Sequence, residues 1–238
     1  MRFIPVFQPN LTRVEIELTT RCNLMCRFCD RRCSQAPAAD DMMLEQIERF
    51  VSDSLNVNYK WESIGLLGGE PTLYPALQDA IALLQRYVAQ NPSCNLFLVS
   101  NGYGKAVTRT LDKISASVKI ERRLKTNDED WFNNIDLAPV DIGEDYRSCS
   151  ITQDCGLGLT RRGFFPCGPG AAVARVLDIK IGADSLSEIT ESNMIEGLKE
   201  TCKYCGHSLQ IQAKDNRCVS SFWQHAYEVY RDAHAPAP

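Results

Sequence analysis

Strand-like and helix-like segments alternate along the first 142 residues of this chain. Apolar or alternating runs predict strands at 12–18, 64–67, 95–100, 117–121 and 135–142, and apolar residues at helical spacing predict helices at 43–55, 77–88 and 106–113. Asp40 and Asp41 are expected to cap the first helix. Strands alternating with helices lie parallel, joined by crossover helices. Because 142 residues are too few for eight such units, we expect an α/β fold, a partial and open (β/α) barrel.

The pattern changes after residue 142, where cysteines lie among glycines and turn residues. We therefore predict two domains, the partial barrel at 1–142 and a small cysteine-rich domain at 143–238. The final segment, Ala233 to Pro238, is rich in Ala and Pro and is expected to be disordered.

Composition excludes several classes of function. The net charge of −4 gives no sign of nucleic-acid binding, and no apolar run approaches the length of a membrane span. The start of the chain is too soon polar for a signal peptide, so we expect a cytoplasmic protein. Eleven cysteines in such a protein indicate metal binding or catalysis rather than disulfides.

Three cysteines, Cys22, Cys26 and Cys29, follow the first predicted strand with the spacing C-x3-C-x2-C. Three thiolates on one loop can hold three irons of a cube-shaped iron–sulfur cluster, which leaves the fourth iron open, whereas electron carriers are normally closed by four. A structural zinc site remains an alternative, since Cys33 could supply a fourth ligand. Cys33 could equally close an ordinary electron-transfer cluster.

A Gly68-Gly69-Glu70-Pro71 sequence follows the second predicted strand. Glycines remove side chains, so the backbone can approach a ligand and adopt unusual dihedrals. Glu70 offers a carboxylate to a cationic group. Ligands of parallel sheets gather at the carboxyl ends of the strands, so we expect Cys22–Cys29, Gly68–Glu70 and Ser100–Asn101 on one rim.

The cysteine spacing and the Gly-Gly-Glu-Pro motif together resemble the radical S-adenosylmethionine (SAM) enzymes. The resemblance implies a [4Fe–4S] cluster at Cys22, Cys26 and Cys29 that binds SAM, and an external electron donor such as flavodoxin or ferredoxin. It also implies SAM contacts from Gly68, Gly69 and Glu70, from Ser100 and Asn101, and from Glu121 and Arg123. A simple turn explains Asn101 equally well, and a solvated charge run explains Glu121 and Arg123.

A second cysteine set, Cys149, Cys167, Cys202 and Cys205, resembles the auxiliary-cluster region of radical SAM proteins with a twitch or SPASM domain. The resemblance implies one auxiliary [4Fe–4S] cluster with these four ligands. The spacing departs from the family, because three residues rather than four separate Gly163 from Cys167, and Cys155 competes with Cys149 as a ligand. A structural zinc site remains the alternative.

The resemblance implies reductive cleavage of SAM to a 5′-deoxyadenosyl radical, which removes a hydrogen atom from a substrate. The size and layout resemble small twitch enzymes that dehydrogenate a small molecule, so we expect a two-electron oxidation. Epimerisation stays open, with Cys155 or Cys218 as the hydrogen-atom donor, as does modification or cross-linking of a peptide substrate. A non-catalytic iron–sulfur or zinc protein is the remaining alternative, and Arg175 is expected at the surface.

Overall fold

The computed structural model describes residues 8–24, 26, 29–31, 40–122, 149–206 and 220–234. Its centre is a sheet of six strands in the order β4-β3-β2-β1-β5-β6. The strands are β1 (Arg13–Glu17), β2 (Ser63–Leu67), β3 (Asn95–Ser100), β4 (Lys119–Arg122), β5 (Leu157–Thr160) and β6 (Gly163–Phe165). The first five run parallel, and β6 pairs antiparallel with β5. The two edge strands do not meet, so the sheet is the open, partial barrel predicted from the sequence.

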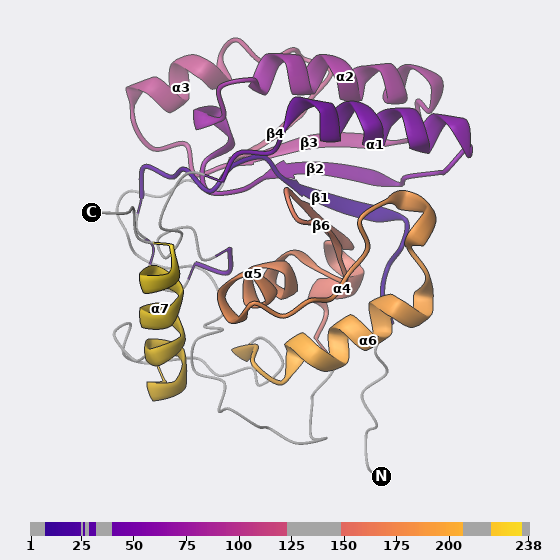
Figure 1. The fold of residues 1–238 in the computed structure, drawn as a ribbon. Helices are drawn as coiled ribbons and strands as arrows, with labels where there is room; N and C mark the ends of the chain where they lie inside the picture. Colours follow the sequence, from indigo (N-terminus) through magenta and orange to yellow (C-terminus); the bar gives the residue numbers. More distant parts are fainter. Residues whose placement is uncertain are drawn as a thin grey trace.

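Three helices, α1 (Leu44–Asn56), α2 (Leu77–Gln90) and α3 (Lys105–Leu111), cover one face of the sheet (Figure 1). The core forms here because β1 alternates, and its apolar positions Val14, Ile16 and Leu18 pack with the apolar stripes of the helices, such as Ile47 and Leu84. Burying these side chains is the main contribution to the stability of this layer.

The opposite face is covered by α5 (Gly168–Leu177), and α4 (Ile151–Asp154), α6 (Glu191–Cys202) and α7 (Ser221–Ala233) lie on the same side (Figure 1). Every residue of α5 except Leu177 is buried. The start of α5 reaches the sheet because Gly158 of β5 has no side chain. A Cβ there would lie 2.9 Å from the Cys167 carbonyl oxygen. The α5 helix therefore fills the inside of the partial barrel.

The first four predicted strands and the three predicted helices are confirmed, with ends that differ by one to two residues. The strand predicted at 135–142 lies outside the described residues. The capping prediction is wrong: α1 is capped by Met43, and Asp41 instead accepts hydrogen bonds from Thr19 and Arg21. The division into two domains at residue 142 stays a prediction, and β5 beyond that point joins the same sheet as β1.

No helix in the part of the chain that the structure describes is long and apolar enough to cross a membrane.

Candidate active site

The first cysteine set lies directly after β1, at the carboxyl edge of the parallel strands. Burial first, and then the charges of Cys29, Cys26 and Glu70, raise the pKa of the Cys22 thiol to about 11. These electrostatic effects place the three thiols near one another and near Glu70. A metal that binds Cys22 must displace the proton that burial keeps on its thiol.

Gly68 and Gly69 fit against the backbone of the cysteine loop. The Gly69 amide donates to the Thr19 carbonyl at 2.8 Å, and the next amide, of Glu70, donates to the Arg21 carbonyl at 2.8 Å. A Cβ on Gly69 would lie 2.7 Å from the Arg21 carbonyl carbon and 3.0 Å from Cys22 Cβ. Gly68 has a φ of 141°, which side chains rarely tolerate. The close approach that requires these glycines is therefore to the cysteine loop itself.

The Glu70 carboxylate is fully buried and satisfied by its own chain. Its Oε1 accepts from the Thr72 hydroxyl at 2.7 Å, the Thr72 amide at 3.2 Å and the Ser100 hydroxyl at 2.9 Å. Its Oε2 accepts from the Asn101 amide at 2.9 Å. The side chain is 0% exposed, and its predicted contact with SAM stays a prediction. Glu70 joins the ends of β2 and β3 and so shapes the rim.

Asn101 connects the end of β3 to the cysteine loop. Its Nδ2 donates to Asn23 Oδ1 at 2.9 Å and lies 4.0 Å from Cys22 Sγ, while Asn23 Nδ2 donates to the Tyr103 carbonyl at 2.7 Å. Ser100 and Asn101 thus lie on the predicted rim. Glu121 lies one residue before the end of β4, level with Val99, and pairs with Lys119 at 3.0 Å; its predicted SAM contact stays a prediction. Arg123 lies outside the described residues.

The second cysteine set is also brought together by the fold. Burial raises the pKa of Cys202 well above its usual value, and the charges of Cys167, Cys205 and Cys149 raise it further. Cys167 is the N-cap of α5, where its sulfur accepts a hydrogen bond from the Gly170 amide at 3.2 Å. The amino end of a helix favours negative charge, so this position suits a thiolate ligand.

The donor set of this second site consists of four thiols from three separate segments, which fits a soft metal such as iron or zinc. No disulfide joins any two of the described cysteines. Among the residues that the structure describes, no three Cys, His, Asp or Glu side chains converge tightly enough for a single metal ion. The thiols are within electrostatic reach of one another.

The charges that act most on Cys155 are those of Glu15, Arg31 and Asp30 rather than those of other cysteines. Burial raises the pKa of its thiol above the usual range, and the next contributor is the Glu15 carboxylate, which also hydrogen-bonds with the thiol. Cys155 precedes β5, whose first residue Leu157 is level with Val14 near the start of β1. The other end of β1, Glu17, is three residues or about 10 Å past Val14 at about 3.3 Å per residue, and the predicted rim lies beyond it. The role of Cys155 as a hydrogen-atom donor stays a prediction. Cys218 lies outside the described residues.

The inside of the barrel contains two buried ion pairs that the sequence prediction missed. Arg31 pairs with Glu15, and Arg175 Nη1 donates to Glu17 Oε1 at 2.6 Å. Arg175 is 4% exposed, so its predicted surface position is wrong. The only sequence signal was the alternation of β1, Glu15-Ile16-Glu17, which predicts a strand but does not say whether its charged face is buried. The α5 helix covers that face instead.

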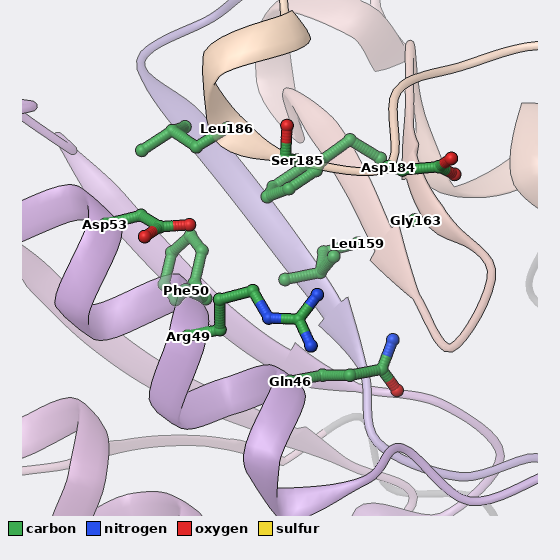
Figure 2. Close-up of a pocket in the computed structure, with 10 residues that line it drawn as sticks. Gln46, Arg49, Phe50, Asp53, Leu159, Gly163, Asp184, Ser185 and Leu186 are labelled. Atoms are coloured by element: carbon green, nitrogen blue, oxygen red, sulfur yellow. The ribbon is translucent and has the colours of Figure 1, made fainter.

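A small cavity lies between α1 and the segment around η4 (Leu186–Glu188), as Figure 2 shows. Phe50, Leu159 and Leu186 line it, with Arg49 and Asp53 on the α1 side. Its volume is about 30 Å³, which is room for little more than a water molecule. No member of either cysteine set lines it, so we assign it no part in the chemistry.

Residues 16–129 match the family model of the radical SAM superfamily. The matched residues include the first cysteine set and the Gly-Gly-Glu-Pro motif. This part of the chain, just under half of its length, is therefore similar to a radical SAM domain.

Among curated proteins, the chain is 29% identical over 126 residues to a GTP 3′,8-cyclase of Streptomyces coelicolor, covering 52% of this chain and 36% of that protein. It is 31% identical over 132 residues to a probable GTP 3′,8-cyclase of Pyrococcus horikoshii, covering 53% of this chain and 40% of that protein. The match thus spans well under half the length of these relatives.

Among solved structures, the fold is similar to that of BtrN in complex with AdoMet and 2-DOIA. The TM-score is 0.52 at 14% sequence identity, and the superposition covers 85% of this chain and 89% of BtrN. At this identity the similarity supports the fold alone.

Proposed function

We propose that this protein reductively cleaves SAM at a [4Fe–4S] cluster held by Cys22, Cys26 and Cys29, and then removes a hydrogen atom from a small-molecule substrate. The observation that carries the proposal is the gathering of these three thiols at the carboxyl edge of the parallel strands, within the part of the chain that is similar to a radical SAM domain. Three protein ligands leave one iron available for SAM.

When bound, the cluster supplies the one electron that breaks a carbon–sulfur bond of SAM and yields methionine and a 5′-deoxyadenosyl radical. Glu70 acts as a positioning residue, since it fixes the Asn101 amide, and Asn101 in turn holds the cysteine loop through Asn23. We propose that the backbone of Gly68 and Gly69 and the Asn101 side chain form the part of the rim that SAM contacts.

For the overall reaction we favour a two-electron oxidation. In an alcohol oxidation the abstracted hydrogen atom leaves with 5′-deoxyadenosine, and the carbon radical then loses one electron and its hydroxyl proton to become a ketone. We propose that Cys149, Cys167, Cys202 and Cys205 hold an auxiliary [4Fe–4S] cluster that takes this electron. Their mutual electrostatic reach supports the four-ligand set, and the position of Cys155 beside Glu15 favours Cys149 over Cys155 as a ligand.

BtrN, whose structure contains AdoMet and 2-DOIA, shares the fold of this chain, so we choose 2-DOIA as the first small molecule to test as a substrate. A second candidate is the cyclisation of GTP, which is favoured by the names of the curated relatives. We expect an electron donor such as flavodoxin or ferredoxin and a reducing compartment such as the cytoplasm, because ligand thiolates must stay reduced.

The test is anaerobic reconstitution with iron and sulfide, followed by dithionite and SAM. We expect 5′-deoxyadenosine from the wild type and none from a Cys22→Ala/Cys26→Ala/Cys29→Ala variant, whose remaining iron reports the auxiliary cluster. Cys94→Ala is the matched control, since Cys94 is buried in the apolar core. Cleavage that persists in the triple variant would refute the assigned site, and zinc in place of the remaining iron would refute the auxiliary cluster.

The two candidate reactions are separated by adding 2-DOIA or GTP to the same assay. We expect 2-DOIA to increase 5′-deoxyadenosine formation and to be oxidised, with no solvent deuterium in the product when the reaction runs in deuterium oxide. Deuterium at a substrate carbon would support epimerisation instead, and turnover of GTP would support the cyclase.

A further inference from the structure

Arg31 follows Cys29 by two residues, yet its guanidinium lies against the second cysteine set. Its side chain packs on Gly168, the residue next to Cys167, and a Cβ on Gly168 would overlap the Arg31 guanidinium. The side chain pairs with Glu15 and has Asp30 at 3.9 Å. The segment after the first cysteine loop therefore delivers a cation to the start of α5.

The α5 helix holds Arg31 in this place from the other side. Arg175, two turns after Cys167, donates from Nη2 to the Arg31 carbonyl oxygen and from Nη1 to Glu17. Arg31 and Arg175 are 6% and 4% exposed, so water screens these charges only weakly. Both ends of the contact are therefore fixed, the guanidinium by Glu15 and the main chain by Arg175.

We propose that Arg31 is a positioning residue of the auxiliary site and that its positive charge raises the reduction potential of the cluster held there. The inference rests on the auxiliary cluster of the proposed function. A fixed cation close to a cluster stabilises the added electron, so it favours the acceptor role that a two-electron oxidation requires. In agreement, the Arg31 charge acts to lower the pKa of Cys167 against the larger effect of burial.

This role also explains why Arg31, which follows the first cysteine set in the sequence, is buried next to the second set. Burying an ion pair is costly in itself, and hydrophobic residues would fill the same space at less cost. If the positive charge of Arg31 stabilises the reduced auxiliary cluster, the Arg31–Glu15 pair has a role beyond packing. Arg31 would then follow the SAM-cleaving cysteines in the sequence, while its charge acts on the auxiliary cluster that accepts the electron.

The experiment is a redox titration of the loaded, full-length protein followed by electron paramagnetic resonance. The signal that survives in the Cys22→Ala/Cys26→Ala/Cys29→Ala variant identifies the auxiliary cluster. In Arg31→Met we expect its reduction equilibrium constant to fall about tenfold, which equals about 59 mV for one electron. Arg31→Lys should restore most of the potential, which a purely structural role would not require.

Arg13→Met is the matched control, because Arg13 lies on the same strand as Glu15 but pairs with Glu62 at the surface, at 3.1 Å. Its potential should equal that of the wild type. If Arg31→Met does not fold, the charge of Arg31 is isolated in the Glu15→Gln background. Glu15→Gln alone should raise the potential, and Arg31→Met/Glu15→Gln should have a lower potential than Glu15→Gln. An unchanged potential in loaded Arg31 variants would overturn the inference and leave the proposed function intact. A wild type that cleaves SAM but holds no auxiliary iron would overturn both the inference and the proposed acceptor.

Discussion

Glu70→Gln should destabilise the protein before any ligand is added. The substitution keeps the shape of the side chain but turns one acceptor oxygen into an NH₂ donor. If the amide oxygen takes the place of Oε1 and keeps Thr72 and Ser100, the NH₂ faces the Asn101 amide, and two donors oppose each other. Losing a charge-assisted hydrogen bond and leaving a buried N–H unpaired costs about 3 kcal/mol. For a chain of this size that corresponds to a fall in Tm of about 6–12 °C.

The assay is urea unfolding of the metal-free protein, with Glu62→Gln as the control. Glu62 pairs with Arg13 at 3.1 Å, but its side chain is 58% exposed, so its loss should cost at most about 1 kcal/mol. If Glu70 were mainly a ligand for SAM, Glu70→Gln would weaken SAM binding and leave the metal-free protein as stable as the control. That result would refute the positioning role.

Three further predictions follow from the packing. Gly69→Ala places a Cβ on the Arg21 carbonyl, so the free energy of unfolding measured in urea should fall by about 1–3 kcal/mol. The same variant should retain less iron at the first cysteine set. Gly170→Ala places a Cβ 3.1 Å from Cys167 Sγ, so it should lower auxiliary iron while 5′-deoxyadenosine still forms. Burial raises the pKa of Cys94 from 9.0 to about 11, so the folded state keeps the thiol proton to a higher pH than the unfolded state does. The free energy of unfolding should therefore fall between pH 9 and 11. In Cys94→Ala this fall should be about 2–3 kcal/mol smaller than in the wild type, measured at each pH.

The outer layer of the fold could be predicted from sequence because its signals are local. Alternation in β1 and helical spacing in α1 and α2 come from neighbouring residues, and the carboxyl-edge rule then placed the first cysteine set near Glu70. The grouping of the second cysteine set came from resemblance to a family rather than from periodicity. The helix α5 that carries Cys167 was not predicted, since its Gly-Pro-Gly start looks like a turn.

The roles of individual polar residues depended on contacts that sequence patterns do not encode. Glu70 looks like a ligand group in its motif, yet its partners Ser100 and Asn101 lie thirty residues away on β3. Glu15 and Glu17 look like an exposed strand face, and only the placement of α5 shows that they are buried. In each case a long-range contact decides whether the charge faces water or the interior.

The burial of Glu15, Glu17 and Arg175 has one physical cause. A parallel sheet with helices on one face alone would leave Glu15 and Glu17 in water, where their charges cost nothing. Once α5 enters the barrel, those carboxylates must be paired, and Arg31 and Arg175 supply the cations from segments far apart in the chain. Arg31 follows Cys29 in the sequence, and Arg175 follows Cys167. Because Arg175 also donates a hydrogen bond to the Arg31 carbonyl, burial of the sheet's inner face fixes the two cysteine sites relative to each other.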